Sequence, residues 1–344
     1  MNRKNIEIEY VSCNFCGSND YAIYLEQEDN RYPQAPRYKF RLVRCKECNL
    51  IYLNPRPTLE FIGNFYPDDY SVYRRIDENY DRESRFIDYF SLSHWRRILT
   101  KREKLSVVKK FCHNKKARLL EIGPGGGSFL KSIKNIGWEA TGIEISSDMC
   151  DHINNSYNIE CFNKDFNNLS DHEIKLLTDN KFDAIVFWSS FEHLYDPKGA
   201  LDLCRNIIKR NGRLIIFVPN ADSLEERFFR KIDKNPVDVP RHLFHFNRST
   251  MKKLFNAAGF KPIRIIDFSF IESSRFKVNM NRLISENFRS KSNISRIFRF
   301  VLYNLSILIG DMLSLVLSIF KRSHSITMVG GKVEIGKTSL TSNI

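Results

Sequence analysis

Short apolar runs alternate with helical periodicities through the middle of the chain. The runs expected to form strands lie at 119–122, 139–145, 157–162, 182–188 and 213–219, with two more at 261–270 and 325–332. Continuous apolar runs of this length are typical of buried parallel strands. Between them apolar residues recur three and four positions apart, which predicts helices, and the same spacing from 87 to 111 predicts a helix before the first strand. This alternation predicts an α/β fold with a doubly wound sheet.

The first predicted strand runs into a glycine-rich turn. Glu121 lies at the end of the strand, and Gly123, Gly125 and Gly127 follow at alternate positions. Glycines allow a tight turn and a close approach of the backbone to a ligand, and the helix behind the turn directs free N–H groups at whatever lies there. The spacing differs from the G-x-G-x-x-G dinucleotide fingerprint. An ordinary tight turn is the alternative.

Polar residues follow the carboxyl ends of the next strands. Glu144 ends the second strand, 21 residues after Gly123, where a carboxylate can accept hydrogen bonds from ribose hydroxyls. Glu192 and His193 follow the fourth strand. In an open α/β sheet ligands bind beyond these strand ends, so we expect these side chains to line a pocket. The geometry of Glu144 alone does not distinguish one nucleoside cofactor from another.

Four of the eight cysteines form two C-x-x-C pairs, Cys13/Cys16 and Cys45/Cys48, with 28 residues between the pairs. Two such pairs complete a tetrahedral four-sulfur site, for which structural Zn²⁺ is the expected occupant. Iron in a rubredoxin-like site and a dithiol redox pair are the alternatives. A module this small depends on its metal for stability. The four remaining cysteines are isolated, which favours a reducing cytoplasm over a disulfide framework.

The net charge of +14 predicts an acidic partner, such as a phosphate-bearing substrate, an anionic membrane or nucleic acid. Near the C-terminus, an apolar run at 301–320 lies between basic residues of the segment 296–322. It is long enough to span a membrane. If the last two strands share one sheet, however, both ends of the insertion return to the same side. Polar residues occupy about a third of its helical circumference, which favours a helix lying on an anionic membrane surface. Packing on the protein core and a dimer interface are the alternatives.

Taken together, the glycine loop, Glu144, Asp165 and the Glu192–His193 pair resemble the class I S-adenosylmethionine-dependent methyltransferases, in their small-molecule branch. The four-cysteine segment resembles a zinc-binding leader of bacterial sugar and surface-polysaccharide methyltransferases. The resemblance implies a Rossmann-like seven-stranded sheet of order 3-2-1-4-5-7-6 with strand 7 antiparallel. It also implies that Glu121 faces the methionine end of the cofactor and that Asp165 binds the adenine amino group, with Phe166 or Phe162 packing on the ring.

The activity implied is methyl transfer from S-adenosylmethionine to a sugar hydroxyl of a small or lipid-linked acceptor. A quinone or another lipid is the alternative acceptor. Histidine can take a proton from a hydroxyl near neutral pH, which makes His193 and His242 the candidate bases. The alternatives are that His242 only holds a loop and that His193 only packs against the cofactor. A nucleic-acid-binding protein and a non-catalytic scaffold are the hypotheses from other classes, and spread-out basic residues disfavour the first.

The expected organisation is a zinc-binding module at 1–56, a linker or flap at 57–89, and a methyltransferase domain at 90–335. The domain contains an inserted helical segment at 270–322, and a tail occupies 336–344. Tyr66 and three further tyrosines recur in the linker or flap. The start of the chain lacks the apolar run of a signal peptide. The sequence therefore predicts a cytoplasmic protein that can lie at the inner face of the membrane.

Overall fold

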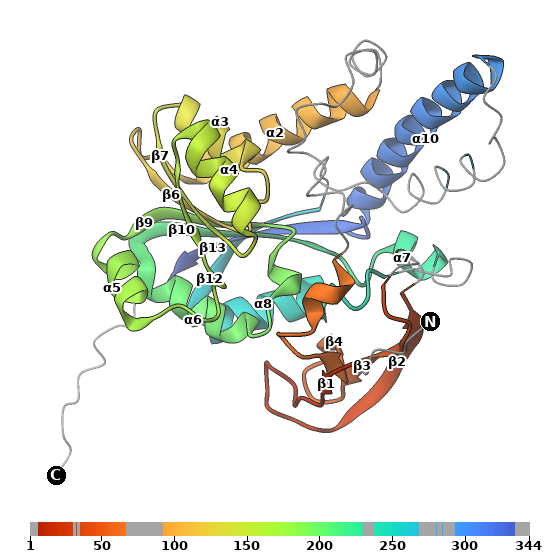
Figure 1. The fold of residues 1–344 in the computed structure, drawn as a ribbon, viewed down its shortest axis with the longest axis horizontal. Coiled ribbons are helices and arrows are strands. Elements are labelled where there is room, and N and C mark those ends of the chain that lie inside the picture. Colours follow the sequence, from red (N-terminus) through yellow and green to blue (C-terminus); the bar gives the residue numbers. More distant parts are fainter. Residues whose placement is uncertain are drawn as a thin grey trace.

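A seven-stranded sheet forms the centre of the protein (Figure 1). The structure is a computed structural model that describes residues 6–29, 32, 35–66, 92–229, 237–267, 280, 284 and 293–333. The strand order is β12-β13-β10-β9-β6-β7-β8, and only β13 is antiparallel to its neighbours. This is the predicted order 3-2-1-4-5-7-6. The strands are β6 (Arg118–Ile122), β7 (Glu139–Glu144), β8 (Glu160–Asn163), β9 (Phe182–Trp188), β10 (Ile208–Pro219), β12 (Phe260–Ile266) and β13 (Ser325–Lys332).

Helices cover both faces of this sheet, as Figure 1 shows. One face carries α2 (Leu92–Phe111), α3 (Ser128–Asn135) and α4 (Ser147–Tyr157), and the other carries α5 (Asp171–Asp179), α6 (Pro197–Ile207) and α8 (Arg248–Ala257). Side chains alternate between two buried clusters along each strand. On β6, Leu119 packs with the α2–α4 side, whereas Leu120 and Ile122 pack with the other. This alternation follows from the period of two in a strand and explains the continuous apolar runs of the sequence.

The N-terminal segment folds into a small β-module against the α5–α8 side. Its elements are β1 (Ile8–Glu9), β2 (Tyr21–Glu28), β3 (Lys39–Cys45), β4 (Ile51–Leu53), β5 (Arg56–Pro57) and the 3-10 turn η1 (Ile62–Phe65). The far strand β11 (Phe244–His245) pairs with β4 and completes a four-stranded sheet of order β11-β4-β3-β2. Residues of the module such as Val43 and Leu50 belong to the same buried cluster as Leu120 of the central sheet. The module and the central sheet therefore share one core.

Three further elements complete the described fold: η3 (Phe191–His193), α7 (Leu224–Phe229) and α10 (Asn293–Ile319). Helix α10 packs along α2 and leads into β13, and its far end projects away from the sheet (Figure 1). Because β13 pairs with β12, both ends of the inserted segment return to the same sheet.

Several predicted boundaries differ from the structure. Tyr157, expected at the start of a strand, is the last residue of α4, and Asn158 ends that helix in the left-handed conformation (φ 49°). The helix after β9 ends at Ile207, and β10 begins directly behind it. At the start of the predicted linker or flap, the chain forms the single 3-10 turn η1. Most of the predicted flap (67–89), part of the insertion and the tail at 336–344 lie outside the described residues.

Candidate functional site

The glycine loop connects β6 to α3 in a conformation that needs glycine. Gly123, Gly125 and Gly127 have φ angles of 68°, 53° and 67°. A Cβ atom on Gly127 would lie 2.5 Å from Cγ1 of Ile153, and one on Gly123 would lie 2.7 Å from Cβ of Ser190. At Gly123 and Gly127, both the left-handed backbone conformation and the close neighbouring atoms therefore exclude a side chain. The loop lies beyond the carboxyl ends of the parallel strands, where ligands bind in such sheets.

Glu144 is held beside this loop by two backbone N–H groups. The N–H of Gly125 donates to its Oε2 atom (2.9 Å) and the N–H of Ser146 donates to its Oε1 atom (3.0 Å). Burial raises the pKa of Glu144 above its usual value, and these N–H donors limit the rise. A carboxylate oxygen can accept more than one hydrogen bond. Glu144 can therefore accept from a bound ligand without losing the bonds that orient it.

A cleft of about 1090 Å³ opens beyond these strand ends. Of the residues predicted from the sequence, Gly123, Gly125, Glu144, Asp165, Phe166 and His193 line it. Of the two phenylalanines predicted to pack on a ring, Phe166 lines the cleft and Phe162 does not. The Oδ1 atom of Asp165 accepts the N–H of Asn167 at 3.0 Å. Pockets that hold one drug-sized ligand measure about 300–1,000 Å³, so the volume of this cleft lies just above the upper end of that range.

Two predicted residues, Glu121 and Gly127, are not part of the cleft lining. Glu121 faces the α2 side of the sheet, where it is fully buried, and its Oε2 atom has no hydrogen-bond partner among the described residues. Burial raises its pKa to about 7; the charge of Glu144 adds to the rise, and Lys104 of α2 opposes it. Gly127 supports the loop from behind, against Ile153.

Among the described residues that line the cleft, His193 is the only histidine. Its Nδ1 atom lies 2.9 Å from the carbonyl oxygen of Arg241 and 3.2 Å from the hydroxyl of Tyr66. Because a carbonyl only accepts, Nδ1 must carry the hydrogen, and Nε2 then keeps its lone pair. Burial lowers the pKa of His193, which keeps the ring neutral at physiological pH. The histidine is thus set up to accept a proton.

His242 lies behind His193, with ring centres 4.8 Å apart. It lines a smaller cavity together with His245 and His324, and not the main cleft. Glu192, His193 and His242 place one ligand-type atom each within 4.8 Å of one another, a set that could hold a metal ion.

Arg241 connects the N-terminal module to this site and is fully buried. Its guanidinium binds Asp29 of the module (2.7 and 3.1 Å) and Asp238 (2.6 and 2.9 Å), and donates to the carbonyl of Phe65 (2.8 Å). These acidic partners raise the pKa of Arg241 further, so the charge is permanent. The same residue supplies the carbonyl that accepts from His193.

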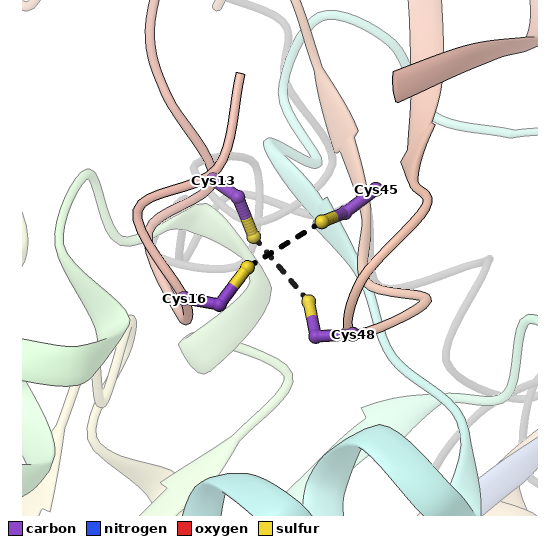
Figure 2. A group of neighbouring side chains, drawn as sticks. All are labelled: Cys13, Cys16, Cys45 and Cys48. Atoms are coloured by element: carbon purple, nitrogen blue, oxygen red, sulfur yellow. Dashed lines mark hydrogen bonds between the residues drawn. The ribbon is translucent and has the colours of Figure 1, made fainter. Parts of the chain in front are cut away.

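The four predicted cysteine ligands converge in the N-terminal module (Figure 2). The Sγ atoms are 3.4 Å apart in the pair Cys13–Cys48 and 3.5 Å apart in the pair Cys16–Cys45. A tetrahedral site with metal–sulfur bonds of 2.3 Å has sulfur–sulfur edges of about 3.8 Å. The chemistry and spacing of these thiols therefore fit a four-sulfur metal site.

The two cysteine pairs have the same local backbone. Gly17 and Asn49 each follow the second cysteine of a pair, with φ angles of 77° and 67°. Their N–H groups donate to the carbonyls of Cys13 (2.8 Å) and Cys45 (3.0 Å). The first pair also contacts the part of the chain that forms the central sheet, since the side-chain amide of Asn14 donates to the Oδ1 atom of Asp196 at 2.8 Å. Asp196 caps the start of α6, next to the cleft residue Tyr195.

Residues 92–265, half of the chain, match the sequence model of a family described as "Methyltransferase domain". Fold and site thus define a class I methyltransferase, and the chain belongs to this methyltransferase-domain family.

A ubiquinone biosynthesis O-methyltransferase of Glaesserella parasuis is 30% identical over 112 residues, which cover 30% of the chain and 45% of the relative. A demethylmenaquinone methyltransferase of Tropheryma whipplei is 25% identical over 149 residues, 42% of the chain and 56% of the relative. The chain thus spans about half the length of these relatives. A crystal structure of a SAM dependent methyltransferase from Archaeoglobus fulgidus is 21% identical, with a TM-score of 0.45 over 73% of the chain and all of that protein.

Sequence reasoning did not assign roles to Arg241 and Asp29, and it placed Tyr66 in a segment that was either a flap over the substrate or a linker. Tyr66 and its neighbours Leu59 and Ile62 line the cleft from the N-terminal module. The recurring tyrosines after residue 65 were the only signal of this. Nothing in the sequence marks Arg241 as buried, since arginine is seldom fully buried unless it is paired.

Proposed function

We propose that the protein transfers a methyl group from S-adenosylmethionine to a hydroxyl group of a small or lipid-linked acceptor. The observation that carries this proposal is one cleft that combines the glycine loop, Glu144 and a neutral, oriented His193. When bound, S-adenosylmethionine supplies an electrophilic methyl group on a sulfonium. The roles that follow belong to residues of this chain.

Glu144 would accept hydrogen bonds from the ribose hydroxyls of the cofactor, because its oxygens are oriented by Gly125 and Ser146. Asp165 would accept from the adenine amino group, with the buried ring of Phe166 beside the base. The donor set fits a nucleoside: carboxylates for hydroxyl and amino groups, and an apolar wall for the ring.

The Nε2 atom of His193 would take the proton of the acceptor hydroxyl as that oxygen attacks the methyl group. Its neutral form and its fixed tautomer both support this role. Tyr66, Leu59 and Ile62 would form the acceptor end of the cleft, since they come from the N-terminal module and not from the cofactor-binding strands. Alignment of acceptor and methyl group would supply much of the rate. His242 would orient His193 from behind.

Our first candidate acceptor is a sugar hydroxyl in a surface-polysaccharide or glycolipid pathway, on the basis of the four-cysteine leader. The second candidate is a quinol hydroxyl, because the curated relatives are named as ubiquinone and demethylmenaquinone methyltransferases. In both cases Zn²⁺ bound by the four cysteines would be structural, since protein ligands fill all four positions. We place the reaction in the cytoplasm, where the eight cysteines, which form no disulfide in the structure, would stay reduced.

Calorimetric titration of the zinc-loaded protein with S-adenosylmethionine and S-adenosylhomocysteine tests the cofactor, with NADH as the control ligand. Micromolar binding of the first two is expected. Glu144→Ala should weaken it by at least tenfold, whereas Glu160→Ala, an exposed acid on the next strand, should not change it. Absence of binding by folded protein would refute the proposal. S-adenosylhomocysteine release with sugar nucleotides, lipid-linked sugars and quinols then separates the two acceptor classes.

A further inference from the structure

Helix α10 turns an apolar face to solvent from Ile297 to Ile319. The exposed apolar residues on this face are Ile297, Phe298, Val301, Leu305, Leu308, Ile309, Met312, Leu315, Val316 and Ile319. At 100° per residue they fall within an arc of about 120°, and they extend for about 33 Å along the helix axis. A helix at the surface of a protein in water normally exposes its polar side instead.

Three polar side chains of α10, those of Asn304, Asp311 and Ser314, contact the rest of the protein. Asp311 forms an ion pair with the buried Arg96 of α2 (3.2 Å), and the Oδ1 atom of Asn304 accepts the N–H of Leu92 (2.6 Å). Ser314 hydrogen-bonds to His324 (2.7 Å), just before β13. These contacts fix the rotation of the helix about its axis. The apolar face is therefore exposed because the polar face is occupied.

The surroundings of this face are basic. Helices α2 and α10 together contain nine arginine and lysine residues and two acidic residues. Arg96 is paired with Asp311, and Lys104 lies over the rings of Phe129 and Trp188; the two helices carry seven further basic residues and one further acid. Arg97, Lys101 and Arg102 of α2 are exposed, as are Lys321 and Arg322 directly behind α10. A second copy of the chain would bring these like charges together. An anionic surface complements them.

We propose that the apolar face of α10 docks on an anionic lipid bilayer, with the helix lying in the plane of the interface and the basic residues of α2 on the lipid head groups. By length and composition the segment Ile297–Ile319 could also cross a membrane. The antiparallel pairing of β12 and β13 brings both ends of the insertion back to the same sheet, which one crossing cannot do. A helix with one apolar face and basic neighbours has the character of an interfacial anchor. The proposal does not depend on the identity of the methyl acceptor.

The unmodified protein contains its own reporter for this docking. Of its three tryptophans, Trp95 at the start of α2 is 51% exposed, whereas Trp138 and Trp188 are buried. Vesicles of phosphatidylcholine with about a third phosphatidylglycerol should shift the tryptophan emission to shorter wavelength, because Trp95 is exposed on α2, the helix that contacts α10. Neutral phosphatidylcholine vesicles should bind at least tenfold more weakly, and high salt should weaken binding to the anionic ones. Trp95→Phe should still sediment with anionic vesicles but lose the shift.

Leu305→Glu combined with Met312→Glu tests the helix face directly, because both residues lie near its centre. Vesicle binding should fall by at least tenfold, with unchanged thermal unfolding as evidence that the variant folds. The matched control is Leu176→Glu on α5, which is 39% exposed and far from α10 (Figure 1). Absence of binding by the unmodified protein to anionic vesicles would overturn the proposal. Vesicle binding by the double variant that equals binding by the unmodified protein would also overturn it. The same holds if the unmodified protein sediments as a dimer and the double variant as a monomer, because a second copy of the chain would then cover the apolar face.

Discussion

Replacing Gly127 by alanine should destabilise the protein strongly, although it adds only one methyl group. The φ angle of 67° at this position costs an alanine about 1–2 kcal/mol. The new Cβ atom would also lie 2.5 Å from Cγ1 and 3.1 Å from Cδ1 of Ile153, which is buried on α4. Overpacking of this kind costs about 1–3 kcal/mol. We therefore expect the free energy of unfolding to fall by about 2–5 kcal/mol.

The neighbouring glycine provides a matched control. Gly126 does not have a positive φ angle, and a Cβ atom there would meet nothing within 4 Å. Gly126→Ala should therefore leave the unfolding free energy within about 0.5 kcal/mol of the unmodified protein. Urea unfolding measured on both variants gives the comparison.

A second substitution separates the two contributions at Gly127. Ile153→Ala removes the atoms that the new methyl group meets but leaves the φ angle unchanged. In the double variant the combined loss should be smaller than the sum of the two single losses, by about 1–3 kcal/mol. If Gly127→Ala were as stable as Gly126→Ala, the loop would not be held against α4 in the left-handed conformation, and this reasoning would be wrong.

Three further predictions concern the buried ion cluster, the candidate base and the metal. Arg241→Met leaves the carboxylates of Asp29 and Asp238 buried without their cation, so chemical denaturation should show a loss of about 3–5 kcal/mol; a loss under about 1 kcal/mol would contradict this. The kcat/KM of methyl transfer should fall as the pH is lowered, with a midpoint below about pH 6.5, because burial lowers the pKa of His193 and the neutral ring is the active form. His193→Gln should abolish this decrease at low pH. A midpoint above about pH 6.5 would argue against His193 as the base. A strong chelator should release one metal ion per chain and lower the melting temperature of the protein. The Cys45→Ser variant should bind no metal ion. A melting temperature that does not change after complete release of the metal would exclude a structural role.

The site was partly predictable because much of it depends on local sequence. Gly123, Gly125 and Gly127 follow a strand directly, and Glu144 ends the next one, so their places follow from chain order. The two C-x-x-C pairs are also local, and the structure brings their sulfurs together. The side of the sheet on which Glu121 lies could have been derived from the alternation of the strand. The resemblance to a family implies that Glu121 faces the methionine end of the cofactor; in the structure it is not among the residues that line the cleft.

Other features of the site depend on contacts between distant parts of the chain. The Arg241–Asp29 ion pair joins residues separated by 212 positions, and β11 pairs with a strand of the N-terminal module. The wall formed by Leu59, Ile62 and Tyr66 belongs to the cleft only because the module packs there. Such contacts have no periodicity and no local spacing, so a single sequence does not reveal them.

By itself, the sequence determined the α/β class, the glycine loop and the two C-x-x-C pairs, because hydrophobic periodicity and turn residues act over short stretches of chain. The strand order followed from the resemblance to the methyltransferase family, and the structure confirms it. The sequence also determined that helix α10 has one apolar side and one polar side. Only the tertiary structure decided which side faces solvent, since that depends on the partners that α2 and His324 offer to Asp311, Asn304 and Ser314. The same holds for His193, whose protonated nitrogen is determined by a carbonyl 48 residues away. Local patterns define which groups a segment carries, whereas the packing of distant segments decides what those groups contact.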